Sequence, residues 1–505
     1  MLVASMLVAA STAAADRGES AVAIAADIDA ALGKAWAADE VVPAERCGDG
    51  EYLRRICLDV IGRIPTAAEA REFVTDPTPS DQKRRRLAAE LFGRPTHLIH
   101  QTNIWRGILI PEASSDIQSR QLVPEFEEWL RRRLLAGRRY DDLVRELLTV
   151  PRLEMSVEAG DARPSAFFEI RNDEPERLAA STTRAFLGVR LECAQCHDHP
   201  FDDWKQDQFW QLAAFFAQPT EFDDQGRPLP SIAVPETERT VAAVFPDGGE
   251  PDASFDPRQP LAEWITGRDN AYFSRAIANR LWAQFFGAGL VEPVDDFSPY
   301  NPAHYPDVLD AVAKAVRDSD FDLDLVAHSL TQTKLYGLSS ATSDPSHHDA
   351  AAFGRMPVRA LSPEQLYDSL SQATGRLRVF DPSQPVNFNG DEARSRFLEQ
   401  FARESVAARD QASSILQALM MMNGDYVSSA VDLSESRTLA AVAGAPFLST
   451  DDRVDALYLA AYARLPTRQE RDLASTAVGA SASERDGLAD LFWAMLNSSE
   501  FLFNH

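Results

Sequence analysis

Two cysteines and a histidine form the pattern in this chain most able to do chemistry. Cys193-Ala-Gln-Cys196-His197 is a Cys-x-x-Cys-His sequence, the pattern through which c-type haem is attached and ligated. Two thiols at this spacing reach the two vinyl groups of one haem, and the next imidazole turns toward the iron. We therefore expect Cys193 and Cys196 to attach c-type haem and His197 to be an axial iron ligand.

Three other chemistries remain open to the same region. A Cys-x-x-Cys pair can be a redox-active disulfide, although such pairs follow a strand in a βαβ pattern that the sequence does not show. Cys193, Cys196 and His199 also have the spacing of ligands to zinc or iron, with a fourth ligand needed from elsewhere. Finally, the cysteines can pair with each other or pack as structural residues.

The second axial position of a haem iron would need a ligand from outside the motif. His199 is too close in sequence to His197 to cross to the opposite haem face. Met155, Met356 and the run Met420–Met422 are candidates, and a methionine would raise the reduction potential. A methionine triplet is more typical of packing, and an open position would instead favour small-ligand binding or peroxidase-like chemistry.

The residues after the motif permit a non-haem site as well. Asp198, His199, Asp202 and Asp203 lie within six positions, and nitrogen and carboxylate ligands suit zinc, manganese or iron. We favour a simpler role for Asp202 and Asp203, which is to cap the helix that follows. His199 remains a candidate ligand, and His505 is a candidate that approaches from the end of the sequence.

Composition limits the partners. The 505 residues include 77 acidic and 50 basic side chains, for a net charge of −27, so nucleic acid is an unfavourable partner because its phosphates are repelled. Basic runs occur at Lys83–Arg86 and Arg131–Arg133. Both have acidic neighbours in helical patterns, and we interpret them as solvated helix faces.

The first residues indicate export. Residues 1–15 form an apolar run that ends in small residues, like a signal peptide without its usual basic start. No stretch reaches 18 uncharged apolar residues, so we expect no transmembrane segment and a soluble periplasmic or extracellular protein. The spacing of Cys47 and Cys57 permits, but does not require, a disulfide in such a compartment.

The elements that must position the motif are mostly helical. Apolar residues recur at helical spacing through 122–148, 184–190 leads as a helix toward the cysteines, and 207–217 carries an aromatic stripe. That stripe is typical of a core and could also wall a haem. Proline, aspartate and glycine dominate 218–260, which predicts an irregular or short β-rich connector. We therefore expect a mainly α protein, with two helical domains joined by this connector.

Two polar clusters stand out in the second half. Asn279-Arg280 lies in a helical pattern with aromatic residues, and Pro293-Val-Asp-Asp-Phe297 contains paired aspartates. Such a pair after proline is more typical of a turn than of a calcium or acid–base site. Arg280 is the expected partner of Asp295 or Asp296. No nucleotide-binding, hydrolase or metalloprotease fingerprint occurs, so the sequence identifies no catalytic residue and leaves open whether the protein is an enzyme.

Several longer motifs resemble a known family. They are found in this order along about nine tenths of the chain: Tyr52–Thr66, Arg184–Phe201, Asn279–Gly287, Pro293–Phe297, Arg359–Leu366, Leu419–Gly424 and Asn497–His505. Together they resemble the secreted planctomycete cytochrome-like proteins, which join two domains of unknown function, numbered 1549 and 1553. The resemblance implies a cytochrome-like domain at 25–217, a connector at 218–260 and a second helical domain at 261–505.

The family implies a suspected haem but no established activity. Many of its members carry an additional amino-terminal cytochrome c domain, which we do not find in this chain. We expect an exported haem protein for electron transfer or redox chemistry, with a redox or cell-surface protein as its partner. The alternatives are a zinc or iron protein that uses the same Cys/His cluster, or a disulfide-bonded scaffold at the cell surface.

Overall fold

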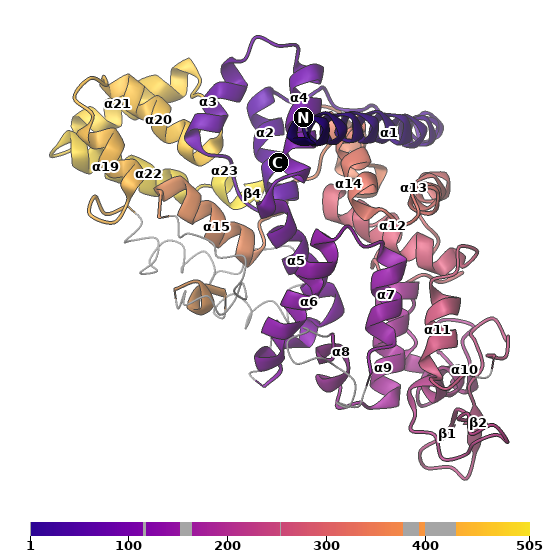
Figure 1. Cartoon of the computed structure of the whole chain (residues 1–505). Helices are drawn as coiled ribbons and strands as arrows, with labels where there is room; N and C mark the ends of the chain where they lie inside the picture. The colour runs from indigo at the N-terminus through magenta and orange to yellow at the C-terminus, as the bar shows by residue number, and fades with distance from the viewer. Residues whose placement is uncertain (1, 115–117, 152–163, 253, 377–392, 399–430) are drawn as a thin grey trace. The chain divides into compact units, whose positions relative to one another are not determined.

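Helices dominate the computed structural model of this chain (Figure 1). It describes residues 2–114, 118–151, 164–252, 254–376, 393–398 and 431–505. Within these ranges the strands form only two sheets, each of two antiparallel strands: β1 (Ser231–Ala233) with β2 (Thr240–Ala242), and β3 (Arg359–Ala360) with β4 (Phe503–Asn504). The prediction of a mainly α protein is confirmed, and β1 and β2 fall within the predicted connector.

The chain forms two compact units that are interleaved in sequence. Unit 1 consists of Met1–Gly18, Val41–Gln101 and Lys334–His505, and unit 2 consists of Glu19–Glu40 and Thr102–Thr333. Each unit therefore combines residues from the first part of the chain with residues from beyond the predicted connector. The division into domains at 25–217, 218–260 and 261–505 describes sequence modules and stays a prediction.

Unit 1 packs helices from both ends of the chain around one core. Its helices are α2 (Asp49–Ile61), α3 (Ala67–Thr75), α4 (Ser80–Phe92), α15 (Pro363–Thr374), α19 (Arg437–Gly444), α20 (Thr450–Tyr462), α21 (Arg468–Ala480), α22 (Glu484–Leu496) and α23 (Ser499–Leu502). Figure 1 shows α3 beside the carboxy-terminal helix α20. Leu58 and Ile64 join the buried side chains of α15, α19, α20 and α22 in one hydrophobic cluster.

Local signals fix several of these helices. Thr66 caps the start of α3 and Ser362 caps the start of α15, each with a capping box in which the side chain at the third helical position returns to the cap backbone. Gly62 ends α2 in the left-handed conformation (φ 73°). From Tyr52 to Ile61 every residue of α2 is buried, so this helix forms the centre of unit 1.

Unit 2 contains most of the helices between residues 102 and 333. These are α6 (Val123–Leu135), α7 (Tyr140–Leu148), α8 (Ala166–Glu169), α9 (Pro175–Thr182), α10 (Gln206–Ala213), α11 (Arg258–Ile265), α12 (Ala271–Phe286), α13 (Pro306–Asp318) and α14 (Leu323–Thr331). A π-helical turn, Thr183–Leu187, continues α9 and packs against α12. The hairpin β1–β2 packs against α10.

Two helices pass from one unit to the other. α5 spans Pro95–Leu109 and α1 spans Leu2–Ala38, so α1 includes the predicted signal segment at 1–15. Beyond that segment, buried side chains follow α1 at helical spacing: Ala21, Ala25, Ile28, Leu32 and Trp36. Within the described residues, no helix combines the length and apolar character needed to cross a membrane. Export stays a prediction.

Candidate cysteine and histidine site

The Cys-x-x-Cys-His motif lies on an exposed loop of unit 2, between the π-helical turn and α10. Glu192–Ala194 forms a short 3-10 turn within this loop. The side chains of Cys193, Cys196 and His197 are exposed, whereas His199 is partly buried. Both cysteines are free thiols. Both thiols of the motif are thus exposed to solvent and not bonded to each other.

His197 has a defined tautomer. Its Nδ1 atom lies 2.7 Å from the carbonyl oxygen of Asp198, and because a carbonyl only accepts, Nδ1 carries the proton. The lone pair of the neutral ring is therefore on Nε2. Histidines that ligate metals commonly donate their other ring N–H to a carbonyl in this way. His197 is prepared to ligate through Nε2.

His199 has the opposite arrangement. The backbone N–H of Phe201 donates to its Nδ1 atom at 3.2 Å, so the lone pair on Nδ1 is used and the proton of the neutral ring is on Nε2. The backbone N–H of His199 itself donates to the carbonyl of Trp204 at 2.8 Å. His199 therefore stabilises the turn after the motif, and this tautomer offers no free ring lone pair.

Two side chains of α10 donate hydrogen bonds to backbone carbonyls of the loop. Gln206 Nε2 donates to the carbonyl of Gln195 at 3.2 Å and to that of Cys196 at 3.0 Å. Trp210 Nε1 donates to the carbonyl of Gln195 at 3.0 Å. These bonds fix the backbone between and after the two cysteines without using the thiols.

Asp198 supplies the carboxylate at the start of α10. Its Oδ1 atom accepts the N–H of Gln206 at 3.1 Å, and Lys205 forms an ion pair with its other oxygen at 3.2 Å. The backbone bond and the Lys205 ammonium lower the pKa of Asp198. The prediction that Asp202 or Asp203 caps this helix was wrong, because the turn places the earlier carboxylate at the helix start.

The remaining acidic residues do not assemble a metal site. Asp202 accepts from the N–H of Asp203, and Asp203 accepts from the hydroxyl of Tyr300 at 3.2 Å. That bond raises the pKa of Tyr300. Across the ranges that the structure describes, no group of three or more His, Cys, Asp or Glu residues is placed to hold a metal ion.

The aromatic stripe after the loop belongs to the core of unit 2. Its members are fully buried or nearly so: Phe209, Trp210, Leu212, Phe215 and Phe216. By contrast, Phe201 is 81% exposed beside the two histidines. The stripe therefore supports the loop from inside, and Phe201 is the apolar side chain that the loop itself presents to solvent.

The other candidate iron ligands lie elsewhere. Met356 is completely buried in unit 1, and His505 also belongs to unit 1, where its carbonyl accepts from Arg55 Nε at 3.2 Å. Met155 and Met420–Met422 fall outside the described residues. None of these residues is assigned to the site by the structure.

Cys47 and Cys57 are both buried and both free, so the disulfide that their spacing permits is not formed. The sulfur of Cys47 accepts from Arg55 Nη1 at 3.6 Å and from Arg84 Nη1 at 3.8 Å. Burial raises the pKa of the Cys57 thiol. Neither buried thiol has the exposure of the Cys193–Cys196 pair.

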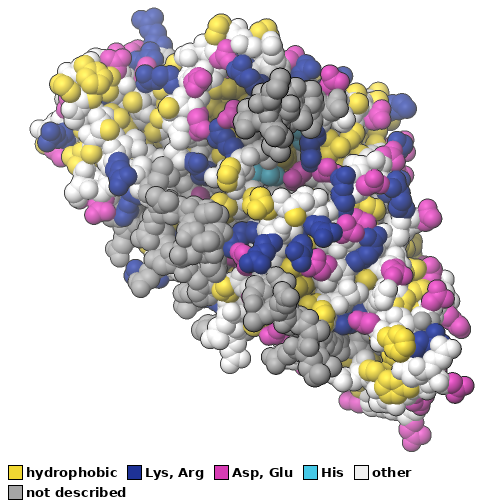
Figure 2. All heavy atoms as spheres, viewed as in Figure 1, with side chains coloured by type: hydrophobic (Ala, Val, Ile, Leu, Met, Phe, Trp, Pro, Cys, Tyr) yellow, Lys and Arg dark blue, Asp and Glu magenta, His cyan; other side chains and the backbone are white. Residues whose placement is uncertain are grey.

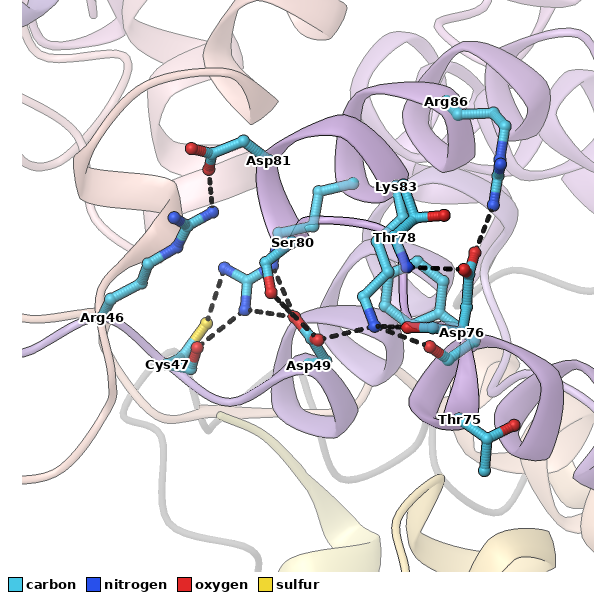
Figure 3. A network of polar contacts seen from close by, with 12 residues as sticks. Arg46, Cys47, Asp49, Thr75, Asp76, Thr78, Ser80, Asp81, Lys83 and Arg86 are labelled. Atoms are coloured by element: carbon cyan, nitrogen blue, oxygen red, sulfur yellow. Dashed lines mark hydrogen bonds and ion pairs between the residues drawn. The ribbon is translucent and has the colours of Figure 1, made fainter.

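Only the second half of the basic run Lys83–Arg86 is solvated: Arg85 and Arg86 are exposed, whereas burial of Lys83 and Arg84 corrects the sequence interpretation for those two residues. Figure 3 shows Lys83 directed at Asp49 and at two backbone carbonyls, whereas Arg86 pairs with Asp76. Lys83 and Arg84 are buried. Burial raises the pKa of Asp49, but its bonds to Lys83, Arg84 and Ser80 outweigh that effect and lower it.

The second basic run behaves similarly. Arg131 is buried and pairs with Glu128 at 2.6 Å, whereas Arg132 is exposed and pairs with the same carboxylate. On the face drawn in Figure 2, basic and acidic side chains are interspersed. The basic runs therefore serve mainly as local ion pairs.

The polar clusters of the second half meet the segment that leads into the loop. Arg190 binds Asp295 through Nε at 2.9 Å and Nη2 at 2.5 Å. Arg280, the partner predicted for Asp295 or Asp296, instead donates to the carbonyl of Arg184 at 2.7 Å. Arg190 was not predicted from the sequence as the partner of Asp295, because the two residues lie 105 positions apart. The one available indication was that each belongs to a motif singled out in the sequence.

Comparison with known protein families finds matches to two parts of the chain. Residues 27–221 match the model of PSCyt2, described as a protein of unknown function (DUF1549), and residues 257–406 match that of PSD1, also described as a protein of unknown function (DUF1553). Neither the curated proteins nor the solved structures gave a match. The first match includes the exposed cysteine loop, and the second includes Asn279 and Asp295. The chain therefore belongs to the family that joins these two domains, as its motifs indicated.

Proposed function

We propose that this chain is an exported haem protein of redox function, in which Cys193 and Cys196 attach c-type haem and His197 ligates the iron. The donor set fits the group: two free, exposed thiols are followed by an imidazole whose Nε2 lone pair is available. The contact of His197 Nδ1 with the carbonyl of Asp198 is the observation that carries the proposal, since it leaves Nε2 as the ring nitrogen that can ligate, which the residue sequence alone does not determine.

The chain contributes access and orientation. Attachment needs reduced thiols that a maturation machinery can reach, and both thiols are exposed and unpaired. Gln206 and Trp210 fix the backbone around the cysteines through its carbonyls, so the thiols remain free. A c-type haem at this position would supply one-electron chemistry, and an exposed site suits exchange with a protein partner.

A zinc or iron centre made by Cys193, Cys196 and His199 is less well supported. His199 would have to release the backbone N–H of Phe201 or change its tautomer before it could bind a metal. A disulfide-bonded scaffold at the cell surface would require Cys193 and Cys196 to be oxidised, whereas they are free thiols here. Both alternatives are outcomes of the experiment below.

The test is a pyridine haemochrome spectrum with intact mass, on protein recovered from a periplasm that performs c-type maturation. We expect a mass gain of one haem and a c-type band. Cys193→Ser with Cys196→Ser abolishes both, and His197→Ala changes the absorption spectrum of the ligated iron. The matched control is His199→Ala, which keeps the haem and its spectrum.

Two results would overturn the proposal. Protein that is folded, exported and haem-free would reject the haem site, and metal analysis with disulfide mapping would then separate the zinc or iron centre from the scaffold. Equal spectra for the wild-type protein and His197→Ala, with haem attached, would reject His197 as the ligand.

A further inference from the structure

One short segment of the second family domain contacts both ends of the cysteine loop. The segment is 293–300, which follows α12 in unit 2, and the loop is 190–204. Asp295 contacts the start of the loop at Arg190 and Tyr300 contacts its end at Asp203, whereas Phe297 contacts Gly188, two positions before the loop. All of these residues belong to unit 2. The two sequence modules therefore share this site.

The start of the loop is held most firmly. Asp295, whose side chain is 10% exposed, accepts two hydrogen bonds from the Arg190 guanidinium. Burial alone would lower the pKa of Arg190, but Asp295 reverses this and raises it. Charge-assisted bonds of this kind are about twice as strong as neutral ones. The pair Arg190–Asp295 thus restrains the backbone of the loop three positions before Cys193.

Gly188 allows the segment to approach the backbone. Its φ of 67° lies in the left-handed region, its carbonyl accepts the N–H of Phe297 at 2.8 Å, and a Cβ atom would lie 2.7 Å from the Phe297 ring. Only glycine meets both conditions without strain. The aromatic ring of the second domain therefore rests directly on the turn that leads into the loop.

The end of the loop is tied more lightly. The hydroxyl of Tyr300 donates to Asp203 at 3.2 Å, and the backbone N–H of Tyr300 donates to the Ser298 hydroxyl at 3.1 Å. Tyr300 is largely exposed, so removing its hydroxyl does not disturb a core. The two ends of the loop can consequently be released separately.

The segment is itself fixed to α12. The completely buried side chain of Asn279 donates to the carbonyl of Val294 in the segment at 3.3 Å, and it also binds the backbone of Leu290 and Val291 just before it. Its neighbour Arg280 donates to the carbonyl of Arg184. Two adjacent residues of one helix therefore position both the segment and the turn that precedes the loop.

We infer that segment 293–300 is a clamp that positions the cysteine loop, with Arg190 and Asp295 as the main positioning residues and Tyr300 as a weaker one. The clamp orients the backbone that carries Cys193, Cys196 and His197 without touching their reactive atoms. That the clamp serves haem binding rests on the proposed function, but whether segment 293–300 restrains the cysteine loop is tested on haem-free protein.

The test is amide hydrogen exchange, followed by mass spectrometry, on the haem-free full chain. Asp295→Asn is expected to raise exchange in peptides covering 191–204 about tenfold, since a charge-assisted bond is lost. Tyr300→Phe raises exchange only toward residue 204. The matched control is Asp310→Asn, which breaks an exposed ion pair between Arg275 of α12 and Asp310 of α13 in the same unit and leaves the loop unchanged.

Charge reversal separates positioning from general stability. Arg190→Asp alone should release the loop, and combining it with Asp295→Arg should restore slow exchange, while peptides of α10 and α12 stay protected throughout. Unchanged exchange in 191–204 for both Asp295→Asn and Tyr300→Phe would overturn the clamp, as would equal loosening over all of unit 2. Because no haem is present, a failed clamp and a failed haem proposal give different results.

Discussion

Asp59 is a buried carboxylate in unit 1, and removing one of its hydrogen-bonding partners should strongly destabilise that unit. Its side chain is 3% exposed and accepts from Arg359 Nη2 at 2.9 and 3.0 Å, from the Tyr336 hydroxyl at 2.8 Å and from Asn504 Nδ2 at 2.8 Å. Burial raises the pKa of Asp59, and Arg359 opposes that effect. The change to make is Arg359→Ala.

The expected cost follows from the burial of the charge that remains. Removing one partner of a buried ion pair costs about 3–5 kcal/mol, which is a large part of the roughly 5–15 kcal/mol that stabilises a typical protein. The exposed pair Arg46–Asp81 in the same unit, shown in Figure 3, is the control. Arg46→Ala should cost less than about 1 kcal/mol.

The pH dependence gives a sharper test. Without Arg359, burial raises the pKa of Asp59 further above its unfolded value of about 3.9. A raised pKa in the folded state means that stability is lost as pH rises through the interval between the two values. The penalty of Arg359→Ala should therefore be large at pH 7 and shrink toward pH 4, and adding Asp59→Asn should recover part of it.

Urea unfolding followed by circular dichroism, at pH 7 and pH 5, measures these differences. Similar slopes against urea concentration would show that the variants change stability and not the extent of unfolding. A cost below about 1 kcal/mol for Arg359→Ala at pH 7, or the same cost at both pH values, would refute the reasoning from a buried charge.

Three further outcomes are expected. Arg464 lowers the pKa of Glu470 to about 2, although burial opposes this shift, so stability is lost as pH falls from about 4.5 to 2. Glu470→Gln should reduce this loss in the free energy of unfolding by about 1–2 kcal/mol, a value lowered for solvent screening because the carboxylate is 34% exposed. Gly188→Ala should cost about 1–3 kcal/mol in urea unfolding, and a neutral result would contradict the strain at φ 67°. In folded, haem-free protein a thiol reagent should modify the two loop cysteines and reach the two buried ones only after unfolding; modification of all four at one rate would contradict the assigned burial.

Local patterns predicted the helices well because they depend on neighbours in sequence. Apolar spacing predicted the helical stripe at 207–217, and its side chains are buried in unit 2. The mainly α class and the short strands within 218–260 follow from the same kind of signal. The exposed loop around Cys193 was recognisable because the motif is contiguous. Its exposure and its tautomers were not predictable, since they depend on backbone carbonyls placed by folding.

Partners that are distant in sequence explain the errors. Arg280 and Arg190 were equally plausible partners for Asp295 by residue type, and only the packing of α12 decides between them. In the run Lys83–Arg86, the sequence does not separate the two buried residues, Lys83 and Arg84, from the two exposed ones because charge patterning does not reveal burial. In the structure, carboxylate and carbonyl acceptors compensate for burying Lys83 and Arg84.

The first family module does not satisfy its buried polar groups on its own. Arg54 and Arg55, both fully buried in α2, donate to the carbonyls of Ala461 and Phe501 and to those of Tyr336 and Leu338. Buried guanidinium groups need such acceptors, and here the acceptors come from beyond residue 333. In unit 2, the segment before the cysteines likewise depends on residues 279–300. Residues beyond 333 therefore complete the core of unit 1, and residues 279–300 contact the segment that precedes the cysteine loop in unit 2. These contacts give a physical reason for the first part of the chain to occur together with the rest.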